Sequence, residues 1–317
     1  MIYLEMHGRL GNQMFQYAAA RSLQIETGQP IGISFKKVIG ANTEGTEGWD
    51  NSLQFFKIAP YEKIDDCKNL FDKLSLFKKS LCLVYAFSYK PLMKNIQRWY
   101  RYQLLWCPLL DKQGIRWIAN GYYNFKNTTE ENFLLNGSFE APQYFDRIRE
   151  VLLKEFKPVE KPLEQNEHLY EIIRNSNSVC VSLRHFKVEG HQKNLYDVCS
   201  REYYQKAIDE MKQRVDSPHF VFFSDDIEWI DSMVNTEGLA YSVETPNNPI
   251  WEKLRLMYSC KHFIIPNSTF AWWAQFLGTY ENKIVVCPSK WFNDAYVSPL
   301  IDTNWIKIDY EGDVVEK

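Results

Sequence analysis

The amino-acid sequence predicts an α/β protein built on a parallel sheet, and two observations lead to this fold class. In the second half of the chain, strand-like and helix-like segments alternate, which is typical of a parallel sheet with helices on both faces. At the start of the chain, a strand-like run at 2–6, a helical pattern and a second strand-like run at 31–35 form a β-loop-α-β opening.

The stretch HGRLGNQMFQYAAA at 7–20 joins the first strand-like run to the first helical pattern. Apolar residues recur there at helical spacing, and Gly28 supplies a stop signal. Gly8 and Gly11 permit a tight turn, and Asn12 is expected to cap the helix. At such a turn backbone can approach a ligand, and helix N–H groups attract negative charge. An ordinary turn before a packed helix explains the same pattern, since neither a Walker loop nor a G-x-G-x-x-G fingerprint is present.

Length and composition exclude several classes of protein. The 317 residues are enough for two domains with separate cores. A net charge of −3 argues against nucleic-acid binding through the overall field. The seven cysteines are scattered and never spaced as C-x-x-C, which favours reduced thiols over a disulfide framework or a zinc site. Met1 opens directly onto the first strand, and no apolar run approaches the roughly 20 residues that span a bilayer. We therefore expect a cytoplasmic protein, or one lying peripherally on the inner membrane.

Residues 73–110 combine basic and aromatic side chains. Seven Lys or Arg residues occur there without any Asp or Glu, interleaved with Phe, Tyr and Trp. Such a segment could dock on an anionic membrane or on a lipid-linked acceptor. The simpler alternative is a set of helices that package an acceptor-side domain and extend their lysines into water.

The middle of the chain carries the expected domain boundary. Residues 116–119 are typical of a strand, and 135–156 indicate an aromatic loop followed by an amphipathic helix. Residues 157–166, KPVEKPLEQN, contain two prolines and mostly polar residues, a composition typical of a linker. We therefore expect an N-terminal domain at 1–158 and a C-terminal domain at 159–317.

In the C-terminal domain, polar residues stand at four successive strand ends. The expected strands are 179–183, 220–223, 239–243, 263–265 and 284–286, and the expected helices are 201–214, 227–234, 249–259 and 269–278. Ligands bind beyond the carboxyl ends of the strands in such a sheet. The residues at those ends are Arg184-His185, Ser224-Asp225-Asp226, Glu244-Thr245 and Asn267-Ser268-Thr269. The pattern thus directs cationic, carboxylate, hydroxyl and amide groups to one crevice.

Arg184 and the start of the last helix form a candidate diphosphate site. Ser268 or Thr269 precedes the apolar stretch FAWWAQFLG, and a Ser/Thr N-cap with unpaired N–H groups behind it suits a diphosphate. Arg184 could hold a phosphate bidentately and stabilise a departing diphosphate. The alternatives are an ordinary N-cap and an ion pair of Arg184 with Asp225 or Glu252. No D-x-D motif or His/Asp/Glu cluster has metal-ligand spacing, so we expect protein cations to offset the diphosphate charge.

Several stretches resemble the alpha-1,2-fucosyltransferases of glycosyltransferase family eleven. They are GRLGNQMFQYA near the N-terminus, VSLRHFK (181–187), YDVCSREYYQKAI (196–208), FVFFSDDIEWI (220–230), WEKLRLMYSCKHFIIPNSTFAWWAQFLG (251–278) and CPSKWF (287–292). The segment after Gly137 resembles a Gly-Tyr-Trp-Gln element of the family, with Phe139-Glu140 in place of Trp-Gln. In 181–187, Arg184 alone keeps the family's polar pattern, and Lys187 stands in place of an acid.

The resemblance implies an α/β, GT-B-like fold with two Rossmann-type domains facing a cleft. It also implies inverting, metal-independent transfer of fucose from GDP-fucose to the 2-hydroxyl of a galactoside, with no cofactor besides this donor substrate. The expected acceptor is a galactose-terminated glycan or oligosaccharide of the cell surface. One version of the hypothesis adds that this acceptor is linked to a lipid.

The resemblance also implies functional roles for individual residues that stand at matching positions of the family's motifs. Arg184 matches the arginine that binds the donor diphosphate, and Asn12 matches the asparagine near the donor phosphates and acceptor. Candidates for proton removal are Glu189, His191 and Asp197. The donor-side residues are Gly8, Arg9, Gly11, Asn12, Arg184, His185, Ser224, Asp225, Asp226, Glu252, Asn267, Ser268 and Thr269. Three alternatives stay open: a nucleotide-sugar-binding protein impaired in catalysis, a glycosyltransferase with another sugar nucleotide, and a membrane-docking adaptor.

Overall fold

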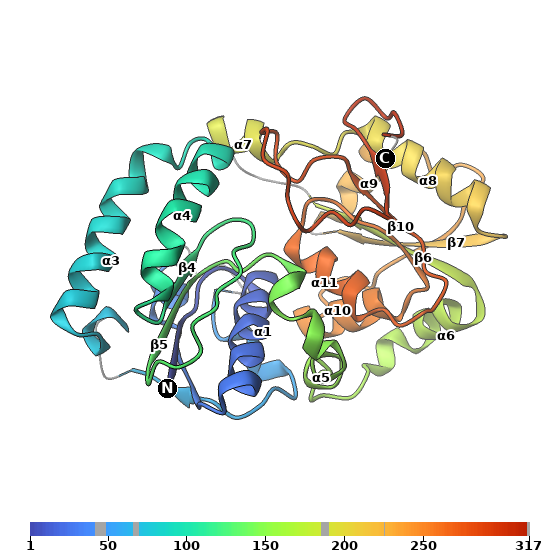
Figure 1. The fold of residues 1–317 in the computed structure, drawn as a ribbon. Coiled ribbons are helices and arrows are strands. Elements are labelled where there is room, and N and C mark those ends of the chain that lie inside the picture. Colours follow the sequence, from blue (N-terminus) through green and yellow to red (C-terminus); the bar gives the residue numbers. More distant parts are fainter. Residues whose placement is uncertain (42–48, 66–69, 185–189, 225, 316–317) are drawn as a thin grey trace. The chain divides into compact units, whose positions relative to one another are not determined.

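The computed structural model describes residues 1–41, 49–65, 70–184, 190–224 and 226–315. The chain divides into two compact units (Figure 1). Unit 1 contains Met1–Phe156 together with Asp294–Pro299, and unit 2 contains Lys157–Asn293 and Leu300–Lys317. The sequence pattern assigned 294–299 to the second half of the chain, whereas the structure groups this short segment with unit 1.

Unit 1 contains a five-stranded sheet in the order β3-β2-β1-β5-β4, in which all neighbouring strands are parallel. The strands are β1 (Ile2–Glu5), β2 (Ile31–Ser34), β3 (Glu62–Lys63), β4 (Ile115–Ile118) and β5 (Phe133–Gly137). The predicted strands at 2–6, 31–35 and 116–119 are confirmed. The prediction of a loop at 135–137 is wrong: β5 is buried along its whole length, and a strand buried on both faces shows no alternation.

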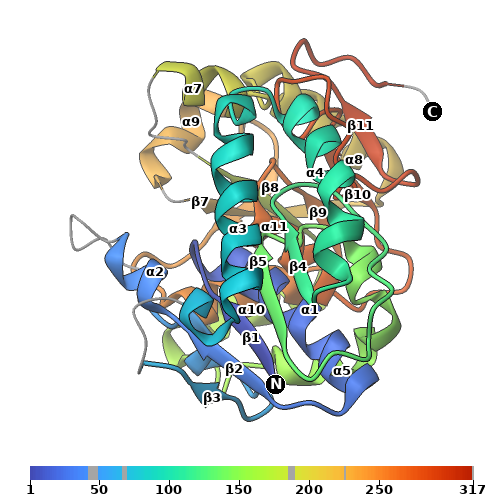
Figure 2. The same cartoon turned by 60° about the vertical axis from the view of Figure 1, so that its left-hand side comes forward.

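Helices cover both faces of this sheet (Figure 1). They are α1 (Leu10–Thr27), α2 (Lys36–Gly40), α3 (Leu76–Tyr89), α4 (Ile96–Asp111) and α5 (Arg149–Glu155). On one face α1 packs with α5, and the Tyr17 hydroxyl donates to Glu155 Oε2 at 2.6 Å. On the other face α3 and α4 lie side by side (Figure 2), where Tyr85, Leu110 and Trp117 belong to one hydrophobic core.

The first helix begins earlier than the sequence predicts. Arg9 occupies the N-cap position of α1, so the prediction that Asn12 caps this helix is wrong. Asn12 lies in the first turn, where its N–H donates to the Arg9 carbonyl at 3.0 Å. Of the two glycines, Gly8 lies in the turn between β1 and α1, and Gly11 is already part of the helix. The predicted stop is confirmed, since Gly28 ends α1 in the left-handed conformation.

The segment Asp294–Pro299 is fastened to the start of α4. The Asp294 carboxylate accepts hydrogen bonds from the N–H groups of Ile96 and Gln97, both at 3.2 Å. A carboxylate at this position also interacts favourably with the helix dipole. The ring of Tyr296 then packs edge-on against Tyr100, with centroids 5.4 Å apart. A late part of the chain is therefore an integral part of unit 1.

Unit 2 contains a six-stranded parallel sheet in the order β11-β10-β9-β6-β7-β8. The strands are β6 (Asn177–Leu183), β7 (Pro218–Ser224), β8 (Ala240–Val243), β9 (His262–Ile264), β10 (Val285–Pro288) and β11 (Ile306–Ile308). All five predicted strands are confirmed, and β11 was not predicted. The chain passes from β6 to β7 and β8 on one side and then returns to β9 on the other. The boundary between β6 and β9 is therefore the topological switch point of this sheet.

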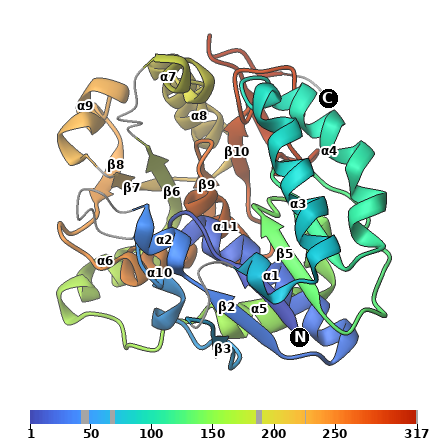
Figure 3. The ribbon, with the colours of Figure 1, turned by 90° about the vertical axis from the view of Figure 1, so that its left-hand side faces the viewer.

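Helices also cover both faces of the second sheet (Figure 3). They are α6 (Glu167–Asn175), α7 (Gly190–Tyr196), α8 (Arg201–Arg214), α9 (Ile230–Met233), α10 (Ile250–Ser259) and α11 (Thr269–Leu277). The predicted helices at 201–214, 249–259 and 269–278 are confirmed, and 227–234 forms a 3-10 turn followed by α9. Trp272 and Trp273 are buried in the core.

Two features of the described residues bear on function. Six cysteines in the described part of the chain are free thiols, and five of them are buried. None of the helices within the described residues has the length and apolar character needed to cross a membrane.

Candidate functional sites in the two units

The turn between β1 and α1 presses Asn12 against glycine backbone. Gly8 has a φ of 75°, and a Cβ atom added there would lie 2.7 Å from Asn12 Nδ2. Asn12 is half-buried, whereas Gly11 is buried and Arg9 is exposed. The Arg9 guanidinium lies 5.8 Å from the centroid of the Trp49 ring. The turn therefore presents an amide and a guanidinium at the carboxyl end of β1.

Two glutamines that the sequence analysis did not single out hold this turn in place. Gln13 and Gln16 are fully buried. Gln13 Nε2 donates to the carbonyls of Gly8 at 3.0 Å and Asp50 at 2.7 Å. Gln16 accepts from the His7 N–H at 3.0 Å and donates back to the His7 carbonyl at 2.8 Å. The spacing G-N-Q-x-x-Q was the available signal, because a buried amide must find partners and the nearest ones are turn backbone.

His7 sits at the start of the same turn in its neutral form. Burial lowers its pKa, and the positive charge of Lys37 lowers it further. The side chain is therefore uncharged near neutral pH and contributes no cation to a phosphate site.

Glu140 is a second residue at the carboxyl edge of the sheet in unit 1. In the sequence it stands out only as a departure from the family pattern. It follows β5, the strand that pairs with β1. Its side chain is half-buried, and the loss of solvent around the carboxyl raises its pKa to about 7. Glu140 also contributes, after burial, to the raised pKa of Tyr296. A carboxyl that titrates near neutral pH is unusual on a protein surface.

In unit 2, Arg184 and Asn267 stand just beyond the carboxyl ends of two neighbouring strands, β6 and β9. Val181 pairs with Ile264 across the β6–β9 boundary, and Arg184 comes one residue after the end of β6 and Asn267 three residues after the end of β9. Both therefore stand at the carboxyl edge of the sheet, at its switch point, where open α/β sheets bind ligands. The half-buried Arg184 directly follows β6, and the buried Asn267 follows β9.

The first turn of α11 opens at the same edge. Ser268 is the N-cap residue, and its hydroxyl accepts from the Ala271 N–H at 3.5 Å, which confirms the predicted cap. Ser268 and Thr269 are half-buried. Asn267 Nδ2 donates to the carbonyls of Tyr196 and Trp291, both at 3.0 Å, so this amide connects the end of α7 to the loop after β10. A helix N-terminus and a strand-end arginine therefore share the carboxyl edge of this sheet, and both groups favour anions.

The end of β7 is held by a buried ion pair. Glu244 Oε1 accepts from the Ser224 N–H at 3.1 Å and from Lys253 Nζ at 2.8 Å. Lys253 Nζ also donates to the Ser224 carbonyl at 3.0 Å. The Ser224 hydroxyl accepts from the N–H of Asp226 and donates to its carbonyl. Ser224 is therefore committed to shaping the turn that carries Asp226.

Glu252, which the resemblance assigns to the donor, makes the contacts of an internal anchor. It is fully buried. Its Oε1 accepts from the Leu163 N–H and from Asn166 Nδ2, both at 3.0 Å. Its Oε2 accepts from Arg255 at 2.9 Å, so the ion pair considered with Arg184 is made by Arg255 instead. These contacts tie α10 to the start of unit 2.

Asp197 lines a different hollow of unit 2. A cavity of about 330 Å³ opens at the ends of β10 and β11, and its lining residues are Asn194, Asp197, Val198, Ser289, Lys290, Asn293, Asp309, Tyr310 and Glu311. The carboxylate of Asp197 is the first cause of the raised pKa of Tyr310. A lining with three carboxylates and one lysine repels a diphosphate but can hydrogen-bond a neutral, hydroxyl-rich ligand.

Some predicted site residues lie outside the described residues, namely His185, Glu189 and Asp225. The backbone of His191 belongs to α7. Among the described residues, no group of three or more His, Cys, Asp or Glu side chains is placed to hold a metal ion.

Comparison with known proteins identifies the family. The sequence pattern described as glycosyl transferase family 11 matches residues 92–309. The O-antigen biosynthesis glycosyltransferase WbnK of Escherichia coli is 28% identical over 327 residues, which cover 97% of this chain and 100% of that protein. An alpha-1,2-colitosyltransferase of Escherichia coli is 26% identical, over 98% of this chain and 99% of the relative.

The fold has a counterpart among solved structures. That of Arabidopsis thaliana FUT1 in complex with GDP matches with a TM-score of 0.51 and 11% identity, over 92% of this chain and 71% of that one. At this identity the likeness concerns the fold, which is α/β and GT-B-like with a parallel sheet in each unit. Because the family pattern covers well over half of its residues, the chain belongs to glycosyl transferase family 11.

Proposed function

We propose that this glycosyltransferase is a galactoside 2-alpha-L-fucosyltransferase that transfers fucose from GDP-fucose, with inversion and without a metal ion. The acceptor is the 2-hydroxyl of a galactose-ended surface glycan or oligosaccharide, carried on a lipid and met at the inner face of the membrane. Unit 2 binds the donor, and unit 1 serves the acceptor side. The proposal is supported by the GRLGNQMFQYA resemblance and by the alpha-1,2 linkage in the name of a full-length relative.

The observation that carries the proposal is that Arg184, directly after β6, and the N-terminus of α11, which follows β9, both lie at the carboxyl edge of the second sheet, beyond the two strands that flank its switch point. A departing GDP carries negative charge that grows as the bond to the sugar breaks. A guanidinium binds phosphate oxygens through two parallel N–H groups, and the first N–H groups of α11 add a second positive end. Interactions that strengthen as the leaving group gains charge lower the barrier directly.

In the proposed reaction, the acceptor oxygen attacks the anomeric carbon from the side opposite the diphosphate. The bond from that carbon to the diphosphate oxygen breaks, GDP leaves with the electron pair, and the acceptor hydroxyl loses its proton. Asn12, held over Gly8 by the turn, orients the sugar-phosphate or the acceptor through its amide. Asp226 and the Ser224 turn receive the base or ribose of the donor.

The test is a transfer assay with GDP-fucose and a panel of galactosides, run with EDTA present. We expect a fucosylated product in which the galactose 2-hydroxyl is substituted, together with stabilisation of the protein by GDP but not by UDP. Stabilisation by UDP in place of GDP refutes the donor. Binding of GDP without transfer to any galactoside favours the impaired, nucleotide-sugar-binding alternative.

A second candidate donor is GDP-colitose, because one full-length relative is named an alpha-1,2-colitosyltransferase. Colitose is fucose without its 3-hydroxyl, so both donors share the diphosphate and the nucleotide. A pocket that hydrogen-bonds this hydroxyl rejects the deoxy sugar strongly, whereas a pocket without such a partner accepts both. The ratio of kcat/KM for GDP-fucose and GDP-colitose therefore decides between the two donors.

A further inference from the structure

The outer faces of α3 and α4 expose large apolar side chains. On α3, Leu76 is 84% exposed and Phe87 65%, and on α4 Leu105 is 77% exposed. Leu83 and Val84 on α3 and Leu109 on α4 belong to the same exposed set. The α3 members recur at helical spacing, so they form one stripe along the helix. We call this set, with Phe77 and Met93, the outer apolar face.

The two helices contribute to one continuous layer. Cys82 and Tyr85 of α3 and Leu110 of α4 point inward to the same core over the first sheet. The opposite sides of both helices therefore point outward in the same direction, as their side-by-side position shows (Figure 2). Large exposed apolar side chains that gather on one layer mark an interaction site.

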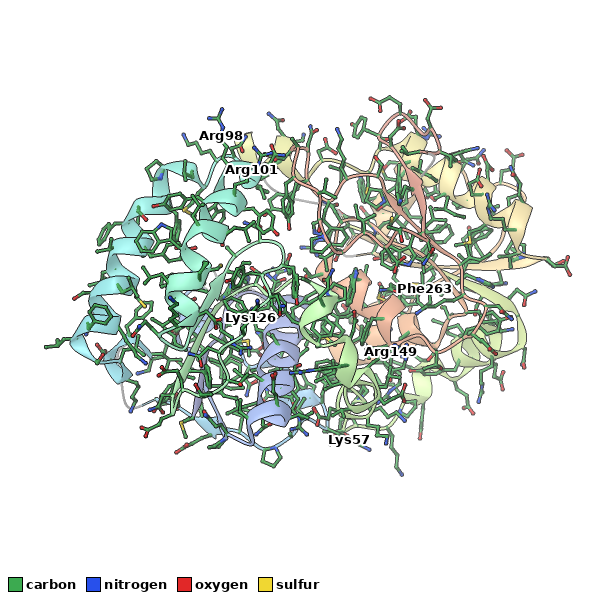
Figure 4. All side chains as sticks on the ribbon, viewed as in Figure 1. Lys57, Arg98, Arg101, Lys126, Arg149 and Phe263 are labelled. Atoms are coloured by element: carbon green, nitrogen blue, oxygen red, sulfur yellow. The ribbon has the colours of Figure 1, made fainter. Side chains whose placement is uncertain are left out.

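The same layer is rich in basic residues, of which Lys78 and Lys79 form ion pairs with Glu130 and Asp72. Residues 73–110 carry seven Lys or Arg and no Asp or Glu, in a chain whose formal net charge is −3. Lys90, Arg98 and Arg101 are exposed around the turn that joins α3 to α4. Figure 4 labels Arg98 and Arg101 at the end of α4 nearest this turn.

We propose that the outer apolar face is a docking surface for an anionic lipid bilayer. Apolar side chains on an amphipathic helix insert between headgroups and acyl chains, while lysines and arginines pair with lipid phosphates. A second copy of the chain fits this face poorly, because a symmetric contact places each basic patch against its own copy. The proposal stands on the surface alone and does not depend on the identity of the donor.

Flotation with lipid vesicles tests the surface. The full-length protein is mixed with vesicles of phosphatidylcholine containing roughly one-third phosphatidylglycerol, and with vesicles of phosphatidylcholine alone. We expect flotation with the anionic vesicles, reduced roughly tenfold or more at about 0.5 M NaCl, where exposed charges are screened. Failure to float with anionic vesicles at low salt overturns the proposal.

Matched variants locate the contact. Leu76→Glu with Phe87→Glu is expected to abolish flotation, whereas Ile39→Glu with Val159→Glu, which changes two other exposed apolar side chains, leaves it intact. The charges are tested in the same way. Flotation of the double variant Arg98→Glu with Arg101→Glu is compared with flotation of a control double variant on α8, Arg201→Glu with Lys212→Glu. Equal flotation of the face variants and their controls refutes the surface. Self-association that the face variants abolish, without vesicle binding, assigns the face to a second copy and also refutes it.

A separate observation concerns Glu140. It lies between the buried residues Phe139 and Ala141, just beyond β5. Its position is fixed by a constrained turn, because a Cβ at Gly137 would lie 1.9 Å from the Ile118 carbonyl and Phe139 has a φ of 52°. The strand next to β5 is β1, whose carboxyl end carries the Gly8–Asn12 turn. Glu140 and Asn12 thus follow neighbouring strands at one edge of the sheet.

The Glu140 carboxylate has no ion-pair partner among the described residues. Burial alone raises the pKa of this carboxyl, with no contribution from a charged group or a hydrogen-bond donor in the part of the chain that the structure describes. The ionisable neighbour on which it acts is Tyr296, from the segment fastened to α4. Structural carboxylates in this protein behave differently, since Glu244 and Glu252 are each paired with a cation.

We propose that Glu140 is the base that takes the proton from the acceptor 2-hydroxyl, which rests on the proposed transfer to a galactoside. The acceptor oxygen forms its bond to the anomeric carbon as its proton passes to a Glu140 oxygen, and GDP departs with the electrons of the broken bond. The raised pKa suits a general base. A carboxyl whose pKa lies near the working pH is deprotonated in a large fraction of the molecules and still has a high affinity for a proton.

The pH dependence of transfer tests this role. For the wild type, kcat is expected to fall about tenfold per pH unit below about 7 as Glu140 becomes protonated. Glu140→Gln should lower kcat by roughly 10²–10⁴-fold and remove this acidic limb, while stabilisation by GDP persists and reports an intact fold. Glu140→Asp should recover part of the rate.

The outcomes separate this proposal from the proposed function. If the wild type transfers fucose and Glu140→Gln keeps both the rate and the acidic limb, the base is wrong and the function stands. If the wild type transfers no sugar to any galactoside, both the base role of Glu140 and the proposed function are refuted. Loss of GDP stabilisation in both Glu140→Gln and Glu140→Asp shows that Glu140 maintains the fold, which also refutes a base role.

Discussion

The side-chain amide of Asn12 lies against the backbone of Gly8, so closely that a Cβ atom at Gly8 would sit 2.7 Å from Asn12 Nδ2. Gly8 also adopts a φ of 75°, where a side chain is strained. Gln13 and Gln16 then fix the backbone of the turn from beneath. Glycine at this position is therefore what allows an asparagine in the first helical turn to be held at the edge of the sheet.

Replacing Gly8 by alanine should displace Asn12 and impair transfer. Gly28→Ala is the matched control, because Gly28 has nearly the same φ, 71°, but nothing lies within 4 Å of its added Cβ. Both changes should lower the free energy of unfolding by about 1–2 kcal/mol through backbone strain. The loss of transfer should be confined to Gly8→Ala. Equal kcat/KM values in the two variants would show that the contact between Gly8 and Asn12 has no part in activity.

Asn12→Ala should lower kcat more than it weakens GDP binding. The amide lies at the carboxyl edge of the first sheet, on the side of the molecule we assign to the acceptor. Removing a single positioned hydrogen-bonding group from a reaction centre typically costs roughly 10²–10³-fold in kcat. Steady-state kinetics and a GDP titration followed by thermal unfolding make the comparison. An unchanged kcat removes Asn12 from the site.

Arg184→Ala should abolish stabilisation by GDP and reduce transfer by roughly 10²–10³-fold, because a bidentate phosphate contact is lost. Arg184→Lys should recover little, since an ammonium group cannot reproduce the planar pair of N–H donors. Arg174→Ala, which removes an exposed arginine from α6, serves as the control. Near-normal turnover of Arg184→Ala would overturn the diphosphate assignment.

Glu252→Ala should act on stability and leave the nucleotide response of the folded protein intact. It leaves the buried guanidinium of Arg255 without its carboxylate, and breaking a buried pair in this way costs about 3–5 kcal/mol of the free energy of unfolding. Glu210→Ala is the contrast, because Glu210 pairs with two more exposed cations, Lys206 and Arg214, and should cost about 1 kcal/mol or less. Chemical denaturation measures both. If the Glu252→Ala variant is as stable as the wild type but is no longer stabilised by GDP, Glu252 belongs to the donor site.

Local pattern was sufficient for most of the elements. The alternation of apolar runs with helical periodicity located every strand of the second sheet except β11, and Ser268 and Gly28 marked helix ends because capping depends on the residues next to the cap. The sequence pattern did not predict β5, because a short apolar run that is buried on both faces has no periodicity. The start of α1 was misplaced because the sequence does not show whether Gly11 belongs to the turn, and the structure places it inside the helix.

The sequence by itself determined the fold class, the family resemblance and the strand ends at which Arg184 and Ser268 stand, because these follow from residues close together in the chain. The tertiary structure alone decided which buried groups are used internally. It pairs Glu252 with Arg255, bonds Gln13 to the backbone of the Gly8 turn, and leaves the half-buried Glu140 without an ion pair among the described residues. Such assignments depend on partners distant in sequence, and the solvation of a carboxylate is set by everything that packs around it.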